Sequence, residues 1–428
     1  MTAMRGRLLP AAVFAGMAAT VAVGLWLARH EGRELGISYP PFVGRWAPDA
    51  TLWAVLAAAL LALVVWAGPR LLSPGLRPAA FAASAFGLTL ALRLALGATS
   101  GGIAGWSRAF DLELFEGPNE YVPALSALRY GPGFFVDRFA ELVPALPVHA
   151  AGHPPGLLLV MDALAIDTPD RLAAVCIVGG ALIAPLAYAL GRMLGDERRA
   201  RIAGLLCAVA PSVLLFGATS ADALYAVIGL LAAVPLASRR LPARIAGALM
   251  LALASLFAWS LLAVGAWAAL LAWRRDGFKD MLVLALLCAA ALVAFHAGLA
   301  ALTGFDPIGT LRATEDVYRF GIASERPYLF WLPGSPTAFL LMLGLPTAWL
   351  ALRSLGAGDD AAVAIFAVIL IAAVAGFTKA EVERIWLFLV PFICLAAAGA
   401  LVDRHLRAVL ALLAVHALAW EIAWGTVW

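Results

Sequence analysis

The sequence predicts an all-α, polytopic membrane protein with about thirteen membrane-spanning helices. Of its 428 residues, 64% are hydrophobic and only 13% are charged, whereas soluble domains carry about 25% charged residues. Apolar stretches recur along the whole chain, and a helix of about 20 such residues crosses the hydrocarbon core of a bilayer. Arginines gather between alternate stretches, as they do in the cytoplasmic loops of membrane proteins.

The apolar stretches define the predicted spans in order. They are residues 8–29, 51–72, 79–97, 171–194, 202–216, 221–237, 243–257, 260–273, 281–303, 337–351, 361–377, 385–402 and 408–424. The stretch 243–273 is too long for one ordinary span, so we interpret it as a helical hairpin. Only this interpretation places all the arginine-rich loops on one side of the membrane.

The arginine-rich side is predicted to be cytoplasmic. Its basic residues precede the first span and occupy the loops around 70–77, 192–201, 239–244, 274–279 and 404–407. The N-terminus is then cytoplasmic and the C-terminus lies outside. Lys occurs twice, Asn once and Gln not at all, a bias typical of GC-rich bacterial genomes, so we expect a bacterial plasma membrane. The net charge of +3 and the lack of basic runs give no indication of nucleic-acid binding.

Two long loops, 98–170 and 304–336, and the short turns 217–220 and 378–384 fall on the outer side. These segments hold most of the acidic residues. In the first long loop, carboxylates alternate with Phe, Leu and Tyr, which predicts short helices lying at the membrane surface rather than a solvated loop. A protein that works on its outer face would have this distribution.

The first outer loop contains the acidic run from which the candidate bases come. Asp111, Glu113, Glu116 and Glu120 lie within ten residues. A carboxylate packed among apolar side chains loses hydration, and its pKa rises toward values that suit a general base. A solvated acidic surface is the other interpretation of this run.

Three further segments contain polar residues beside predicted spans. His153 begins a His-Pro-Pro-Gly motif and could bind an anion or a metal, although the prolines also suit a simple helix start. Asp222 could be a functional acid or an ordinary helix cap. The turn with Lys379, Glu381, Glu383 and Arg384 places a guanidinium at headgroup depth, where it could snorkel or bind a lipid phosphate through two hydrogen bonds.

The order of these motifs resembles the C-type glycosyltransferase (GT-C) superfamily. The resemblance rests on Glu120-Tyr121, on His153-Pro154-Pro155, on Ser220-Ala221-Asp222 and on the short helical hairpin. The Gly-His-Pro-Pro-Gly and Glu-Val-Glu-Arg-Ile-Trp segments also resemble actinobacterial membrane proteins of this type. The resemblance implies a catalytic module over residues 79–428, with two N-terminal helices in residues 1–78 outside it.

The resemblance implies a membrane glycosyltransferase. Such an enzyme moves a sugar from a polyprenyl-phosphate donor to a cell-envelope glycan, lipid or protein acceptor on the outer face, with inversion as the simplest outcome. Glu120 or Asp111 would be the base; the family motif is Asp-Glu where this chain has Asn119-Glu120, so both stay open. Arg384 and Lys379 would bind the phosphate, with Tyr121, His153, Asp222, Glu381 and Glu383 as further substrate-binding residues. A requirement for Mg²⁺ or Mn²⁺ stays open.

A transporter or flippase of lipid-linked substrates is the alternative function. It requires ionisable residues within spans, and Arg93, Asp162 and His296 are the candidates. Inverted repeats would also be expected, and the sequence contains no convincing internal repeat. A non-catalytic scaffold, in which the outer acids are replaceable, is a third possibility.

Overall fold

The chain is almost entirely helical. The computed structural model describes residues 2–216, 218–426 and 428, and 77% of the chain is helix, which confirms the predicted all-α class. Within the described residues, the named strands are β1 (Arg45–Trp46) and β2 (Trp424–Gly425), which pair antiparallel. This pair ties the segment after the first helix to the C-terminal segment.

Six helical segments are long and apolar enough to cross a membrane. They are Leu8–His30 within α1 (Thr2–His30), Trp53–Leu72 (α2, Trp53–Ala67, with η1, Gly68–Leu72), α3 (Pro78–Gly97), Pro169–Met193 (α9, Pro169–Gly180, with α10, Ile183–Met193), α16 (Phe278–Thr303) and α23 (Asp403–Ala423). A seventh is possible if a bent helix pair counts as one span. These segments make the chain a polytopic membrane protein by length and composition, while the number thirteen stays a prediction.

Two predicted spans are broken. Residues 202–216 contain the end of α11 (Glu197–Ala208) and the start of α12 (Pro211–Leu215), because Pro211 cannot continue a helix. Residues 337–351 contain a 114° bend between α18 (Tyr328–Leu343) and α19 (Leu345–Gly356). Gly344 adopts φ +105° at this bend, a conformation that glycine reaches without strain.

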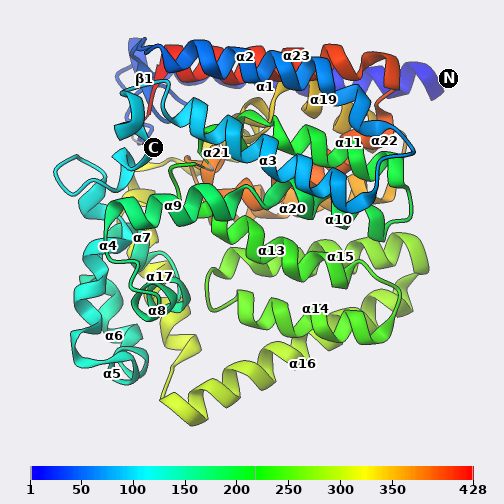
Figure 1. The fold of residues 1–428 in the computed structure, drawn as a ribbon. Helices are drawn as coiled ribbons and strands as arrows, with labels where there is room; N and C mark the ends of the chain where they lie inside the picture. Colours follow the sequence, from blue (N-terminus) through cyan, green and yellow to red (C-terminus); the bar gives the residue numbers. More distant parts are fainter. Residues whose placement is uncertain (1, 217, 427) are drawn as a thin grey trace.

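The remaining apolar helices are shorter. They are α13 (Asp222–Leu236), α14 (Leu241–Ala254), α15 (Leu262–Asp276), α20 (Asp360–Ala375) and α22 (Val390–Ala400), with the short α21 (Val382–Ile385) and η9 (Leu387–Leu389) before α22. The stretch 243–273 forms two helices, α14 and α15, joined through η7 (Trp259–Leu261). Figure 1 shows them side by side, as the hairpin interpretation predicts.

The first two helices belong to the same core as the rest of the chain. Figure 1 shows α1, α2 and α23 along one face of the bundle. Helix α2 packs against α3 and α23, and α1 packs against α18 and α19. Met17 and Ala57 are members of the main hydrophobic cluster. Residues 1–78 therefore share packing with residues 79–428.

The first outer loop is a chain of short helices. In order they are η2 (Gly102–Trp106), η3 (Arg108–Phe110), η4 (Gly117–Asn119), α4 (Tyr121–Ala124), η5 (Leu125–Tyr130), α5 (Pro132–Asp137), α6 (Phe139–Leu142), η6 (Val143–Ala145), α7 (Val148–Ala151) and α8 (Gly156–Ala163). The second outer loop forms α17 (Pro307–Phe320), η8 (Ile322–Glu325) and the start of α18, and α17 packs on α6 and η6. The two long loops therefore form one layer.

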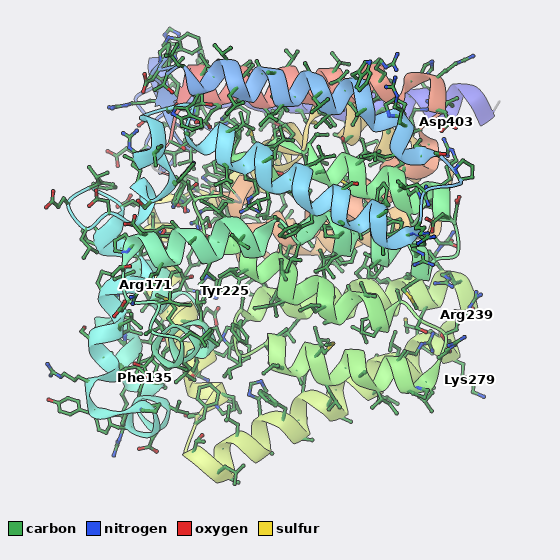
Figure 2. The ribbon with its side chains drawn as sticks, in the orientation of Figure 1. Phe135, Arg171, Tyr225, Arg239, Lys279 and Asp403 are labelled. Atoms are coloured by element: carbon green, nitrogen blue, oxygen red, sulfur yellow. The ribbon has the colours of Figure 1, made fainter. Side chains whose placement is uncertain are left out.

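This layer lies at one end of the bundle. Figure 2 places Phe135 and Arg171 at that end, whereas Arg239, Lys279 and Asp403 lie at the other. Helix α1 begins at the end with the basic loops, and the C-terminal residue lies toward the layer of short helices (Figure 1). This two-ended arrangement agrees with the charge pattern of the sequence. Which end faces the cytoplasm stays a prediction, and of the predicted turn 217–220, residue 217 lies outside the described residues.

The His-Pro-Pro-Gly motif joins this layer to the hairpin. The Gly156 N–H donates to the Leu256 carbonyl at 2.8 Å. A Cβ atom at Gly156 would lie 2.5 Å from that carbonyl oxygen, which is a backbone atom and cannot move alone. The glycine therefore permits the close approach of α8 to the loop between α14 and η7.

We expect Gly156→Ala to destabilise the protein by roughly 1–3 kcal/mol through overpacking. Gly152→Ala is the matched control, because a Cβ atom there has only ordinary contacts of 3.5 Å or more. Thermal unfolding in detergent would measure both variants. Equal midpoints for the two would contradict the role assigned to Gly156.

Candidate functional site

Four segments that are distant in sequence meet beneath the layer of short helices. We call the group the outer cluster. Its side chains form three sets of contacts, and the charged groups of these sets are close enough to shift one another's pKa. The members are Glu116, Glu120, Tyr121, His149, His153, Asp222, Tyr225, Glu381 and Arg384. They come from η4 and α4, from the region of α7 and α8, from the start of α13, and from α21. Figure 2 labels Tyr225, which lies toward the end of α13 near this layer.

Arg384 is held from three sides. Its Nη1 donates to Asp222 Oδ2 at 2.6 Å and its Nη2 donates to Glu381 Oε2 at 2.8 Å. The Trp428 ring lies 4.2 Å from its guanidinium carbon. Burial opposes the charged form, but the carboxylates of Asp222, Glu381 and Glu120 outweigh it and raise the pKa of Arg384. The guanidinium is therefore fixed and charged, and its buried Nε has no partner among the described residues.

The turn before α21 is strained. Ala380 and Glu381 adopt φ values of +63° and +57°, a left-handed conformation that costs energy for residues other than glycine. Ion pairs of Glu381 with Arg384 and Arg326 hold the turn in this conformation. Burial alone would raise the pKa of Glu381, but these two arginines outweigh burial and lower the pKa to about 2. The strained turn places the side chains of Glu381 and Arg384 within the outer cluster.

Glu120 is a buried carboxyl group with one free oxygen. Its side chain is 2% exposed, its Oε1 lies 3.8 Å from His149 Nε2, and its Oε2 has no partner among the described residues. Burial raises the pKa of Glu120 to about 7, against the opposing charges of His149 and Arg384. A carboxylate with this pKa and a free oxygen can accept a proton at neutral pH.

His149 lies between Glu120 and Glu116. Its Nε2 is 2.6 Å from Glu116 Oε1, a hydrogen bond. Burial would lower the pKa of His149, but the neighbouring carboxylates of Glu120 and Glu116 outweigh burial and raise it. The carboxylates therefore favour the charged form of His149 beside Glu120.

An aromatic stack lies on the other side of Glu120. The Tyr225 hydroxyl donates to the Tyr121 hydroxyl at 2.9 Å, and the His153 ring lies 4.6 Å from the Tyr225 ring. Burial lowers the pKa of His153 to about 4. The imidazole of His153 is therefore neutral, and it packs against the rings of Tyr121 and Tyr225.

Three predicted site residues form their polar contacts elsewhere. Asp111 Oδ1 accepts from the N–H of Glu113 in its own turn. Lys379 Nζ donates to the carbonyls of Ala323 and Arg326, both at 2.7 Å. Glu383 Oε1 accepts from the Val43 N–H at 3.1 Å. These contacts stabilise the loops around the outer cluster.

The structure adds residues that sequence reasoning did not select. Glu116 was in the acidic run, and His149 stands four residues before His153, so both had weak local signals. Tyr225 follows Asp222 by three residues and faces the same way on a helix. Arg326 and Trp428 come from distant segments, and only tertiary packing brings them to the cluster.

The shifted pKa of the buried Glu383 should make the free energy of unfolding depend on pH. Burial raises its pKa to about 7 from 4.5. The native state then binds this proton more tightly than the unfolded state. Protonated Glu383 stabilises the fold fully at pH values below its pKa in the unfolded chain. This stabilisation declines as pH rises and is lost above the pKa of Glu383 in the folded protein.

We therefore expect the wild type to lose up to about 3 kcal/mol of stability relative to Glu383→Gln as pH rises from about 4.5 to about 7. Its thermal midpoint should fall over the same range. Glu113→Gln, at an exposed position, is the control. Unfolding scans across this range would measure the effect. Parallel pH profiles for wild type and Glu383→Gln would refute it.

Among the described residues, Glu116, Glu120 and His149 could hold a metal ion. Their ligand atoms lie within 4.8 Å of one another. The 2.6 Å contact between His149 and Glu116 is hydrogen-bond length, and the two atoms would have to separate to share an ion. Imidazole also suits zinc better than Mg²⁺. This arrangement does not fit the Mg²⁺ that the resemblance left open, so we derive no step through a metal.

The comparison with protein-family models finds no match, and the comparison with curated proteins finds none either. The functional argument therefore rests on the geometry of the outer cluster.

Proposed function

We propose that this protein is an integral membrane glycosyltransferase of the GT-C type. It would transfer a sugar from a polyprenyl-phosphate donor to a glycan, lipid or protein acceptor at the outer face of a bacterial plasma membrane. The fold would then be the GT-C-like arrangement with about thirteen spans, in which the shorter helices α13, α14, α15, α20 and α22 also lie in the membrane. The layer of short helices would lie at the outer interface.

The observation that carries the proposal is that Glu120 and Arg384 are both buried and lie close enough for each charge to shift the pKa of the other. Glycosyl transfer from a lipid phosphate needs a base for the acceptor hydroxyl and a cation for the departing phosphate. Glu120 has a free oxygen and a pKa of about 7, and Arg384 is a fixed guanidinium with a free Nε–H. The layer of short helices covers both groups, so water is largely excluded from them.

The reaction would proceed by one inverting displacement. Glu120 accepts the proton of the acceptor hydroxyl, and the acceptor oxygen forms a bond to the anomeric carbon. The bond between that carbon and the phosphate oxygen breaks, and polyprenyl phosphate departs with the electron pair. Arg384 Nε donates to the departing phosphate, while Asp222 and Glu381 hold the guanidinium in position.

The aromatic stack and His149 would complete the site. The phenols of Tyr121 and Tyr225, with neutral His153, form an amphipathic wall of the kind that packs against sugar rings. His149, held by Glu116, would stabilise the ionised form of Glu120 in the resting enzyme. Lys379 and Glu383 would act through the loops that they fasten rather than through the substrate.

Arg93 is the observation that favours a transporter. It is fully buried in α3, its Nη2 donates to the Cys176 carbonyl at 3.0 Å, and its Nε and Nη1 have no partner among the described residues. Such a group in a span is a common feature of transport pathways. The other two candidates give less support: His296 bonds to Ser255, and Asp162 is exposed on α8.

Purified protein supplied with a panel of polyprenyl-phosphate sugars tests the proposal. We expect release of polyprenyl phosphate from at least one donor and transfer or hydrolysis of its sugar. A parallel assay in proteoliposomes would follow the movement of the same labelled lipids between leaflets. Movement of the lipids without any sugar release would replace the proposed function with the transporter.

A further inference from the structure

A small cavity opens next to the outer cluster. Its volume is about 60 Å³, which is room for about two water-sized groups. Ser100, Arg108, Thr219, Glu421, Trp424 and Trp428 are among the residues that line it. We call it the Trp428 cavity.

Trp428 separates this cavity from the outer cluster. Its indole lies over the Arg384 guanidinium at 4.2 Å, and its ring centre is 6.1 Å from that of His149. His149 in turn lies 3.8 Å from Glu120. A molecule held in the cavity would therefore approach the proposed base and phosphate-binding residue across one indole ring.

The cavity brings together a carboxyl group, a guanidinium and an indole N–H without a partner. Glu421 contributes a carboxylate and Arg108 a guanidinium, and neither forms an ion pair within the described part of the chain. The Trp428 Nε1–H is buried, and no described residue accepts a hydrogen bond from it. Ser100 and Thr219 add hydroxyl oxygens that can accept, because their own hydrogens are donated to the Glu421 and Leu215 carbonyls. Because a carboxyl group and a guanidinium share this wall, the lining does not favour an anion over a neutral ligand.

A neutral polyol fits the lining better. Sugar hydroxyl groups both donate and accept, so they can pair with a carboxylate, a guanidinium and hydroxyl groups together. The indoles of Trp424 and Trp428 present apolar bodies with polar N–H groups, which suit the mixed surface of a sugar ring. The volume admits a hydroxyl or hydroxymethyl edge of the ring, and the remainder would lie at the open side.

We propose that the Trp428 cavity is a subsite for the acceptor saccharide. This inference rests on the proposed transferase function and names the class of acceptor, a glycan with an accessible terminal sugar. Glu421 and Trp428 bind its hydroxyl-bearing edge. The adjoining hydroxyl group reaches Glu120 when the Trp428 indole, which lies between the cavity and the outer cluster, moves aside.

The test uses the full chain in lipid nanodiscs without any donor. Saturation-transfer NMR would follow methyl α-mannopyranoside, methyl β-galactopyranoside and methyl α-arabinofuranoside as acceptor analogues. We expect at least one to bind the wild type, and we expect Glu421→Gln and Trp428→Ala each to weaken that binding by roughly tenfold or more. Trp46→Ala and Glu113→Gln, which do not line the cavity, should bind as the wild type does.

The outcomes separate this inference from the function on which it rests. Absence of binding by the wild type overturns the subsite. Trp428→Phe is a second variant, which retains the aromatic core of the side chain. Unchanged binding by both Glu421→Gln and Trp428→Phe also overturns the subsite. Wild-type hydrolysis of a polyprenyl-phosphate sugar, measured separately, tests the function alone. Hydrolysis without glycoside binding would remove the subsite and leave the transferase. Size-exclusion profiles would identify any variant that fails to fold.

Discussion

Arg384→Lys is expected to lower turnover of the polyprenyl-phosphate donor by roughly a hundredfold or more. The guanidinium donates to Asp222 through one nitrogen and to Glu381 through the other, and its third nitrogen stays free. A lysine ammonium keeps the charge but is a single point, and it cannot hold both carboxylates while donating to a phosphate. Steady-state kinetics with a varied donor would measure the loss.

Arg326→Lys is the matched control for this variant. Arg326 also pairs with Glu381 and is as buried as Arg384, but its other hydrogen bond goes to the Lys379 carbonyl. Its replacement should lower the thermal midpoint and reduce turnover much less. If both variants lose turnover in proportion to stability, Arg384 is a structural residue and does not bind the phosphate.

The helical class and the gathering of the basic loops at one end of the bundle could be predicted from sequence, because both follow from composition along the chain. A run of apolar residues forms a helix wherever water is absent, and arginines mark the ends of the runs. The breaks at Pro211 and Gly344 were missed, although both residue types interrupt helices. A length criterion alone treats 202–216 and 337–351 as continuous. Broken helices are tolerated where neighbouring helices bury and satisfy the backbone.

The candidate site could be predicted in part. Glu120, Tyr121, His153, Asp222, Glu381 and Arg384 were selected from separate motifs, and the structure brings them into one cluster. Asp111, Lys379 and Glu383 had equally good local patterns, yet their contacts are with nearby loops. Charge and position in a loop do not determine which way a side chain points. The role of Trp428 depends on packing between the C-terminal segment and α21, which has no local signature.

Glu120→Gln is expected to lower the rate of transfer by roughly a hundredfold to ten-thousandfold while leaving donor binding largely intact. The amide has nearly the shape of the carboxyl group, so the burial of the side chain and its contact with the short helices should survive. It cannot accept the acceptor proton. Single-turnover kinetics with saturating donor would isolate this step, and donor binding would be measured separately by titration.

Two further variants decide which carboxylate is the base. Asp111→Asn should retain near-normal turnover, because Asp111 caps its own turn through the Glu113 N–H. Glu116→Gln should have an intermediate effect, because it weakens the 2.6 Å contact that orients His149 beside Glu120. If Asp111→Asn is inactive and Glu120→Gln is active, the base is Asp111, and the loop must rearrange when substrate binds. If Glu120→Gln and Asp111→Asn are both fully active, proton transfer to an outer-loop carboxylate is not part of the reaction. The buried charge at Glu120 would then serve only to hold His149 and Arg384 in place.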